Sequence, residues 1–283
     1  MNKINKKEIQ EMNYSDFVGL IGERNRPSGG IRTVQEVAVN AFINNKKKML
    51  EIGSNTGFTS VNMSLLTGCE VVGIDTVERS INEAKKYAKE QGLKSKNVKF
   101  IKANTLELPF ADDSFDVVWC SNVTSFISNK EGAIKEYLRV LKQGGSLVVV
   151  PIYYIKEPLK EVLEEVSRAI GVEIKVWNKL FWKDLFKNVS KKSSSPIDLY
   201  YESDFEYLNR KNAIPGYVNE IINQDHLLNF SYSEKEILKE KFQYFINLFN
   251  ENLKYAGYSI LIYQKKLIHE ETELFLTKKR ELH

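Results

Sequence analysis

The feature that most constrains the fold is an alternation of two residue patterns between residues 48 and 150. Short runs that are mostly β-branched or aromatic alternate with stretches whose apolar residues recur every three or four positions. Parallel strands cannot be joined by a tight hairpin, whereas a helix can connect them. The alternation therefore predicts an α/β fold with a doubly wound, mostly parallel sheet. The expected strands are 49–52, 70–75, 98–101, 115–120 and 146–150, and the clearest helices between them are 77–91 and 129–141.

The segments on either side extend the sheet and add helices. Helical patterns at 1–22 and 31–42 either cover the sheet or, for residues 1–30, form a lid over a pocket. After residue 155 we expect helices at 157–170, 177–189, 217–229 and 234–253 and strands at 197–208 and 258–263. The predicted organisation is an N-terminal helical lid (1–45), an α/β core (46–155), the remainder of the sheet with a helical cap (156–266) and a polar tail (267–283).

Composition excludes several classes of protein. The chain has 283 residues, of which 42% are hydrophobic, which is enough to fill a core. Its net charge of +4 is far from the concentrated positive field of a nucleic-acid groove, so no nucleic-acid partner is expected. The first twenty residues carry charges throughout, and the longest apolar run (147–155) is less than half of the ~20 residues that span a bilayer. We therefore expect a cytoplasmic protein with no membrane span.

The two cysteines predict neither a disulfide framework nor a metal site. Cys69 and Cys120 have no CxxC partner and no histidine-rich neighbourhood. A reducing compartment suits them, and no metal is expected.

A glycine-containing turn follows the first expected strand, in the stretch 50–58 (LEIGSNTGF). Such a turn exposes backbone N–H groups at the carboxyl edge of a sheet, where a polar ligand can approach. Asp75 ends the second strand 22 residues beyond Gly53, about where a carboxylate reaches a nucleotide ribose. The turn lacks the GxGxxG register, and Glu51 beside it disfavours a pyrophosphate. A cationic or zwitterionic nucleoside suits this site better.

Four ordered motifs resemble those of the class I S-adenosylmethionine-dependent methyltransferases, over roughly residues 47–153. Residues 51–57 (EIGSNTG) are similar to the family's acidic-x-Gly-x-Gly-x-Gly motif, and Asp75 falls at its ribose-binding acid. Residues 104–118 resemble the stretch that spans strands three and four, and 139–145 match the turn before strand five. The resemblance implies a seven-stranded Rossmann-like sheet, S-adenosyl-L-methionine as cofactor and S-adenosyl-L-homocysteine as product.

The resemblance also assigns residues to the cofactor. The glycines pass close to its methionine part, Glu51 orients its ammonium, and Asp75 accepts from both ribose hydroxyls. The full expected set is Glu51, Gly53, Ser54, Asn55, Gly57, Asp75, Thr76, Val77, Asn104, Thr105 and Ser121.

Two positions depart from the family pattern. Asn55 replaces the central glycine, and asparagine visits the left-handed region more readily than other non-glycine residues. Asn104 stands where most relatives carry an aspartate that accepts from the adenine amino group. Its amide oxygen can accept the same hydrogen bond without charge assistance, so weaker cofactor binding stays open.

The acceptor side is less constrained. Methyl transfer from a sulfonium is an in-line displacement that depends mainly on alignment, and a general base is optional. The expected substrate residues are Arg32, Asn122, Tyr153, Tyr154, Tyr200 and Tyr201, and the candidate bases are His226, Tyr153 and Tyr154. No pattern distinguishes an oxygen, nitrogen, carbon or carboxylate acceptor, and none indicates the oligomeric state.

Methylation of a small molecule is the leading hypothesis for function. Ser121-Asn122-Val123-Thr124 stands where the family's Asn-Pro-Pro-Tyr signature for amino groups would follow strand four, and the long segment after strand five suits an enclosed pocket. RNA methylation by the same fold is an alternative, as is a non-catalytic cofactor-binding or partner subunit. A nicotinamide oxidoreductase is disfavoured by Glu51 and the missing glycine register.

Overall fold

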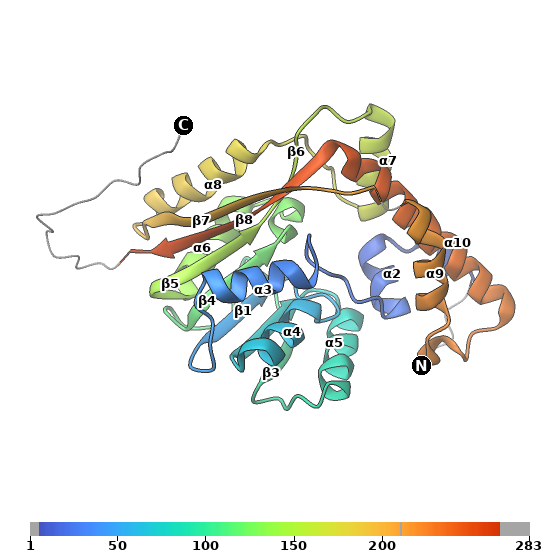
Figure 1. Ribbon diagram of the computed structural model, residues 1–283, viewed down its shortest axis with the longest axis horizontal. Helices are drawn as coiled ribbons and strands as arrows, with labels where there is room; N and C mark the ends of the chain where they lie inside the picture. Colours follow the sequence, from blue (N-terminus) through green and yellow to red (C-terminus); the bar gives the residue numbers. More distant parts are fainter. Residues whose placement is uncertain (1–5, 210, 267–283) are drawn as a thin grey trace, which may run out of the picture.

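One twisted sheet runs through the computed structural model, which describes residues 6–209 and 211–266 (Figure 1). Its parallel strands follow the order β3-β2-β1-β4-β5, and β8 then pairs antiparallel with β5, with β7 on its other edge. The bounds are β1 Lys48–Ile52, β2 Glu70–Asp75, β3 Val98–Lys102, β4 Phe115–Ser121, β5 Leu141–Val150, β6 Ile152–Tyr154, β7 Ile197–Glu206 and β8 Ala256–Lys265.

β6 is the continuation of β5 beyond Pro151. Val149 pairs with Leu261, and Ile152 pairs with Tyr258 in the same register. Because proline has no N–H to donate to the ladder, the strand is interrupted there. With β5 and β6 counted as one strand, the described sheet has the seven strands that the sequence predicts, in a mostly parallel α/β arrangement.

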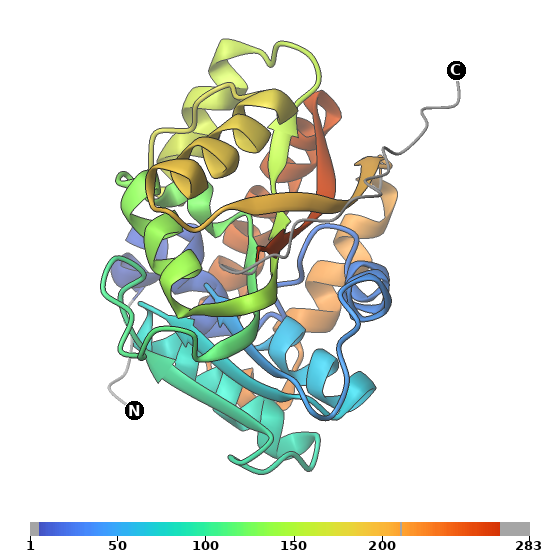
Figure 2. The same ribbon diagram turned by 90° about the vertical axis from the view of Figure 1, so that its left-hand side faces the viewer.

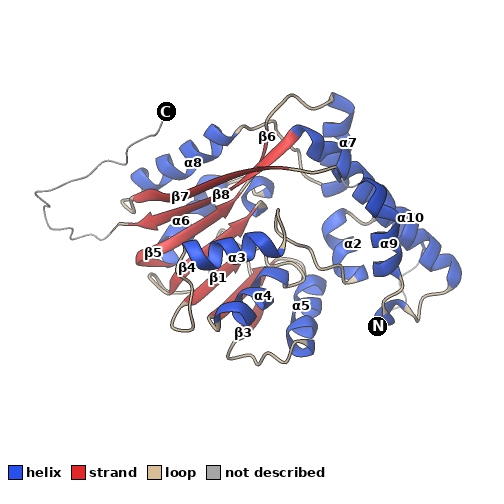
Figure 3. Cartoon of the chain, viewed as in Figure 1, coloured by secondary structure: helices blue, strands red, loops and turns tan. Residues whose placement is uncertain are grey.

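Helices cover both faces of this sheet (Figures 2 and 3). One face packs against α3 (Ile31–Asn40), α4 (Phe58–Thr67) and α5 (Glu78–Glu90), and the other packs against α6 (Lys130–Val140) and α8 (Lys179–Lys192). Adjacent residues of β4 enter opposite cores, with Trp119 on the first face and Val118 on the second. The central strands are therefore buried on both sides, which explains their continuous apolar sequence.

The remaining helices form a separate cap at the carboxyl edge of the parallel strands (Figure 1). These are α1 Lys6–Glu11, α2 Tyr14–Ile21, α7 Lys160–Ile170, α9 Ile214–Ile222 and α10 Tyr232–Asn252. They share an apolar cluster in which Phe17 of α2 packs near Phe242 of α10. The N-terminal helices thus join the cap, whereas α3 covers the sheet.

Two helix predictions need correction. The helix expected over residues 1–22 is broken, because the Asn13 side chain accepts from the backbone N–H of Asp16 and begins α2. The helix expected over 217–229 ends at Ile222, and a short 3₁₀ turn follows at Asp225–Leu227. The predicted tail at 267–283 lies outside the described residues.

Over residues 6–209 and 211–266, no helix has both the length and the apolar composition needed to cross a membrane.

A buried lysine joins β8 to the end of α6. The Lys265 side chain is 4% exposed, and its Nζ donates to the carbonyl oxygens of Leu138 at 2.8 Å and Leu141 at 2.6 Å. It also lies 3.2 Å from Oδ1 of Asp113. One buried charged group thus donates to two carbonyl oxygens near the end of α6.

We predict that Lys265→Met lowers the free energy of unfolding by about 1–3 kcal/mol, because it leaves these carbonyls unpaired. Lys266→Met is the matched control, since its more exposed ammonium pairs with Asp198 and should cost less than about 1 kcal/mol. Urea unfolding of both variants measures the difference. Equal losses would contradict the role assigned to Lys265.

Candidate active site

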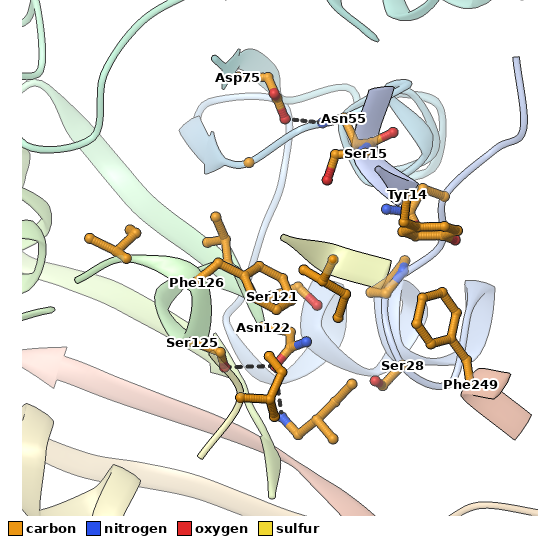
Figure 4. Close-up of a pocket in the computed structure, with 18 of the residues that line it drawn as sticks. Tyr14, Ser15, Ser28, Asn55, Asp75, Ser121, Asn122, Ser125, Phe126 and Phe249 are labelled. Carbon is orange, nitrogen blue, oxygen red and sulfur yellow. Dashed lines mark hydrogen bonds between the residues drawn. The ribbon is translucent and has the colours of Figure 1, made fainter. Parts of the chain in front are cut away.

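A cavity of about 1150 Å³ lies between the carboxyl edge of the sheet and the cap (Figure 4). Its floor is the edge where β1 lies between β2 and β4, the point at which the strand order reverses and open α/β sheets bind ligands. The walls come from three parts of the chain: the N-terminal segment 14–30, the loops that follow β1, β2, β3 and β4, and the cap.

The turn after β1 brings backbone close to this cavity. Gly53 has φ +71°, and a Cβ added there would lie 2.7 Å from Cγ2 of Val123. Asn55 occupies the left-handed region at φ +44°, as the sequence suggested for an asparagine in place of glycine. The turn therefore requires a residue without a side chain at position 53.

Asp75 closes the turn from the neighbouring strand. Its Oδ2 accepts from the backbone N–H of Asn55 at 2.9 Å, and its Oδ1 accepts from that of Val77 at 2.9 Å (Figure 4). Burial raises the pKa of Asp75, while the backbone N–H groups of Val77, Asn55 and Thr76 oppose the rise. Each carboxylate oxygen keeps a further lone pair for a ligand.

Most of the predicted cofactor residues line the cavity together: Gly53, Asn55, Asp75, Thr76, Val77, Asn104, Thr105 and Ser121. The Oδ1 of Asn104, however, accepts from the backbone N–H of Leu106 at 3.0 Å. The oxygen expected to meet an adenine amino group is thus already engaged in closing a local turn.

Three predicted residues do not line the cavity. Glu51 is 4% exposed and accepts from Ser60 Oγ beneath the turn. Ser54 is 2% exposed, and Gly57 lies against Ala84 and Phe100, where a Cβ would meet both at 2.9 Å. Their positions support the turn from below. Glu51 contacts Ser60 of α4, so its expected role in orienting the ammonium, directly or through water, stays a prediction.

Of the predicted acceptor residues, Asn122 and Tyr154 reach the cavity. Asn122 has φ +54°, and its Oδ1 accepts from Ser125 Oγ at 2.9 Å (Figure 4). The hydroxyl of Tyr154 donates to Oδ1 of Asn252 at 2.9 Å, which joins the end of β6 to the end of α10. Both side chains are held by hydrogen bonds rather than free to swing.

Tyr153 and Arg32 lie away from the cavity. Tyr153 alternates with Tyr154 along β6 and points to the other face, where its hydroxyl accepts from Ser259 Oγ at 3.0 Å. Arg32 is exposed on α3.

The two other substrate candidates and the candidate base His226 also lie outside the cavity. Tyr200 and Tyr201 sit on the edge strand β7, where Tyr200 packs beside Phe42 and Tyr201 donates to Oε1 of Glu36 at 2.7 Å. His226 lies in the cap with its Nε2 2.8 Å from the carbonyl oxygen of Ile21. None of these three residues lines the cavity, and neither do Tyr153 and Arg32.

Sequence reasoning missed much of the wall. The cavity is also lined by Tyr14, Arg26, Ser28, Gly29, Gly30, Phe126, Trp177 and Phe249. The predicted lid over residues 1–30 covers the five of these that lie between Tyr14 and Gly30, and no sequence signal indicated Phe126, Trp177 or Phe249. Apolar positions of cap helices that face a cavity have the same spacing as positions that face a core.

The segment that leads into α3 is hydrogen-bonded to Thr56 of the glycine turn. Thr56 Oγ1 donates to the carbonyl oxygen of Glu23 at 2.6 Å and accepts from the backbone N–H of Asn25 at 3.1 Å. Gly30 is the N-cap of α3 and lines the cavity, so the positive end of the helix dipole faces the cavity. An anionic ligand group is favoured there.

Charged and metal-binding groups are few. Among the described residues that line the cavity, the charged ones are Arg26, Asp75 and Lys175, and none is a histidine. Across the described part of the chain, no group of three or more His, Cys, Asp or Glu side chains is placed to hold a metal ion.

Comparison with known proteins adds to this geometry. A family model described as "Methyltransferase domain" matches residues 43–194. An uncharacterized protein of Haemophilus influenzae is 29% identical over 174 residues, which cover 61% of this chain and 69% of that protein. A sterol 24-C-methyltransferase of Pneumocystis carinii is 34% identical over 109 residues, 38% of this chain but only 29% of the relative. The crystal structure of the MccD protein matches with a TM-score of 0.68 at 23% identity, over 86% of this chain and 100% of that one.

The buried carboxyl group of Glu51 predicts that the stability of the protein depends on pH. Burial raises its pKa from 4.5 to about 7, although hydrogen bonds from Ser60 and Thr59 oppose the rise. The stability that this group contributes is therefore complete below about pH 4.5 and is lost as the pH rises through about 7. Glu51→Gln removes this titration.

We expect the stability of Glu51→Gln relative to the parent to rise by up to about 3 kcal/mol between pH 4.5 and pH 8. Urea unfolding of both proteins without ligand, at the two pH values, gives the difference. A difference that does not change with pH would show that Glu51 is ionised throughout.

Proposed function

Because the chain belongs to the class I S-adenosylmethionine-dependent methyltransferases, we propose that it transfers the cofactor's methyl group to a small molecule enclosed between the sheet and the cap. The observation that carries the proposal is the continuity of one cavity from the glycine turn and Asp75 to the apolar wall of the cap. The volume of about 1150 Å³ exceeds the usual range for a single small ligand, which leaves room for an acceptor beside the cofactor.

The residues at the sheet edge fit this cofactor. Gly53 lets the backbone approach the methionine part, and the free lone pairs of Asp75 accept from the two ribose hydroxyls. Thr76 and Val77 would lie against the adenine. The N-terminus of α3 at Ser28–Gly30 would hold the carboxylate of the cofactor, because backbone dipoles favour a negative charge there.

Asn104 takes a different part from the one that the family pattern implies. Its oxygen already accepts one hydrogen bond from Leu106, and its amide nitrogen carries two donors that an aspartate would lack. It would donate to a ring nitrogen of adenine instead of accepting from the amino group. This contact preserves recognition of the base without a carboxylate.

The bound cofactor supplies a methyl group on a positively charged sulfur. The chain's own contribution is alignment and exclusion of water, because the described lining includes no histidine to act as a base. The hydrogen bonds that fix Asn122 and Tyr154 set the shape of the space where the acceptor lies. An acceptor that has no proton to lose, or loses it after transfer, suits such a site.

A small acceptor is favoured over RNA for two reasons. The acceptor space is roofed by cap helices, and its cations are two, Arg26 and Lys175, among the described lining residues. A nucleic-acid groove requires many phosphate contacts along an open surface. The similarity to an enzyme named for methylating a sterol supports an apolar acceptor.

The function is tested by incubating the protein with S-adenosylmethionine that carries a tritiated methyl group, in the presence of an organic extract of cells or of total RNA. Label transferred to the organic extract supports the proposal. Label transferred to RNA alone supports the RNA alternative, and cofactor binding without transfer to either substrate supports a non-catalytic protein.

Asp75→Ala should weaken S-adenosylhomocysteine binding by about 1–3 kcal/mol, since it removes the charged acceptors for the ribose and frees the turn at Asn55. Glu78→Ala is the control, because that acid lies three residues away and is 57% exposed in a pair with Lys102. Isothermal calorimetry measures both affinities. Unchanged affinity in folded Asp75→Ala would remove Asp75 from the site.

A further inference from the structure

We propose that the acceptor is an apolar molecule with one anionic group, and that Lys130 and Lys175 bind this group at the cap-side rim of the cavity. The inference rests on the proposed function, since it names the class of acceptor for the same cavity.

The cap side of the cavity is strongly apolar. Val166 and Ile170 of α7, Ile174 and Trp177 of the following segment, and Phe249 and Leu253 at the end of α10 line it. Among the described lining residues, the one carboxylate is Asp75, at the opposite, sheet-edge side. A cationic acceptor would therefore find no counter-ion in this region, and burying an unpaired charge is costly.

Lys130 and Lys175 lie near Trp177, which lines the cap side of the cavity. Lys175 lines the cavity, and the Nζ of Lys130 lies 4.5 Å from the centre of the Trp177 ring. Lys130 Nζ also donates to the carbonyl oxygen of Ile127 at 2.7 Å, so its ammonium is held in place. The charge of Lys175 acts on the Lys130 ammonium, so both cations contribute to the potential at this side of the cavity.

These positive charges are poorly neutralised by the protein. Within the described residues, Lys175 has only Glu173, an 80% exposed carboxylate at 3.9 Å, and Lys130 has no ion pair. The adjacent Glu131 is paired with Lys192 at 3.3 Å. Burial and the charge of Lys175 together lower the pKa of Lys130, as expected for two cations with no anion between them.

The backbone fixes the rim in position. The N–H of Ile174 donates to Ser167 Oγ at 3.0 Å, and the carbonyl oxygen of Trp177 accepts from the N–H of Tyr154 at 2.9 Å. Lys130 is the first residue of α6, so the positive helix end adds to the same potential. A cation at that end is unfavourable for the helix, which points to a role outside it.

The test uses four decyl compounds of equal chain length, each titrated by calorimetry into the protein saturated with S-adenosylhomocysteine, below the micelle concentration. Decanoate or decyl phosphate should bind at least about tenfold more tightly than 1-decanol, because each adds charge-assisted hydrogen bonds. Which of the two is tighter identifies the anion. Decyltrimethylammonium should bind more weakly than decanol.

The double variant Lys130→Met/Lys175→Met should lose the preference for the anion, to within about threefold of decanol, while its decanol affinity is kept. Lys187→Met, an exposed lysine on α8, is the control and should keep the full preference.

The inference is overturned if decanol binds as tightly as both anions, if no decyl compound binds, or if the double variant keeps the preference. In each of these cases S-adenosylhomocysteine binding by the parent still supports the proposed function. Failure of the parent to bind S-adenosylhomocysteine would contradict the proposed function itself.

Discussion

The site depends on the carboxylate of Asp75. By accepting from the backbone N–H groups of Asn55 and Val77, it joins the end of β2 to the glycine turn after β1 and to the start of α5. Burial alone would push this group towards its neutral form, and the backbone N–H groups counter that tendency. Because this carboxyl edge of the sheet is already ordered before a ligand binds, less free energy is lost in ordering it on binding.

A second set of polar contacts joins the glycine turn after β1 to the cap. The segment 23–30 is fastened to the turn through Thr56, and the buried Glu23 on the same segment accepts from the hydroxyl of Tyr217 in α9. Arg26 donates to that hydroxyl at 3.0 Å. The N-terminal segment therefore links the cap side of the cavity to the glycine turn.

The sequence predicts those parts of the molecule whose signal is local. The positions of the strands, the turn at Gly53 and the position of Asp75 follow from short patterns, and the structure contains them, although β5 begins at Leu141, five residues before the expected start. The choice between Tyr153 and Tyr154 was not predictable, because it depends on which face of β6 meets the cap. Likewise, nothing in the sequence shows that Leu106 engages the oxygen of Asn104. Cap residues that line the cavity look like core until the packing of five separate helices is known.

The layout of charge in the proposed complex also bears on which atom receives the methyl group. Asp75 ends β2, whereas the carbonyl oxygen of Trp177 is hydrogen-bonded to β6, the extension of β5. These two strands are three strand spacings apart across β1 and β4, about 14 Å. An anionic group bound by the lysines is disfavoured near the carboxylate of Asp75. The apolar body of the acceptor would then extend towards the glycine turn, where the residues proposed to hold the cofactor lie. In this orientation the methyl group would be transferred to an atom of the apolar body, and the anion would serve to position the molecule.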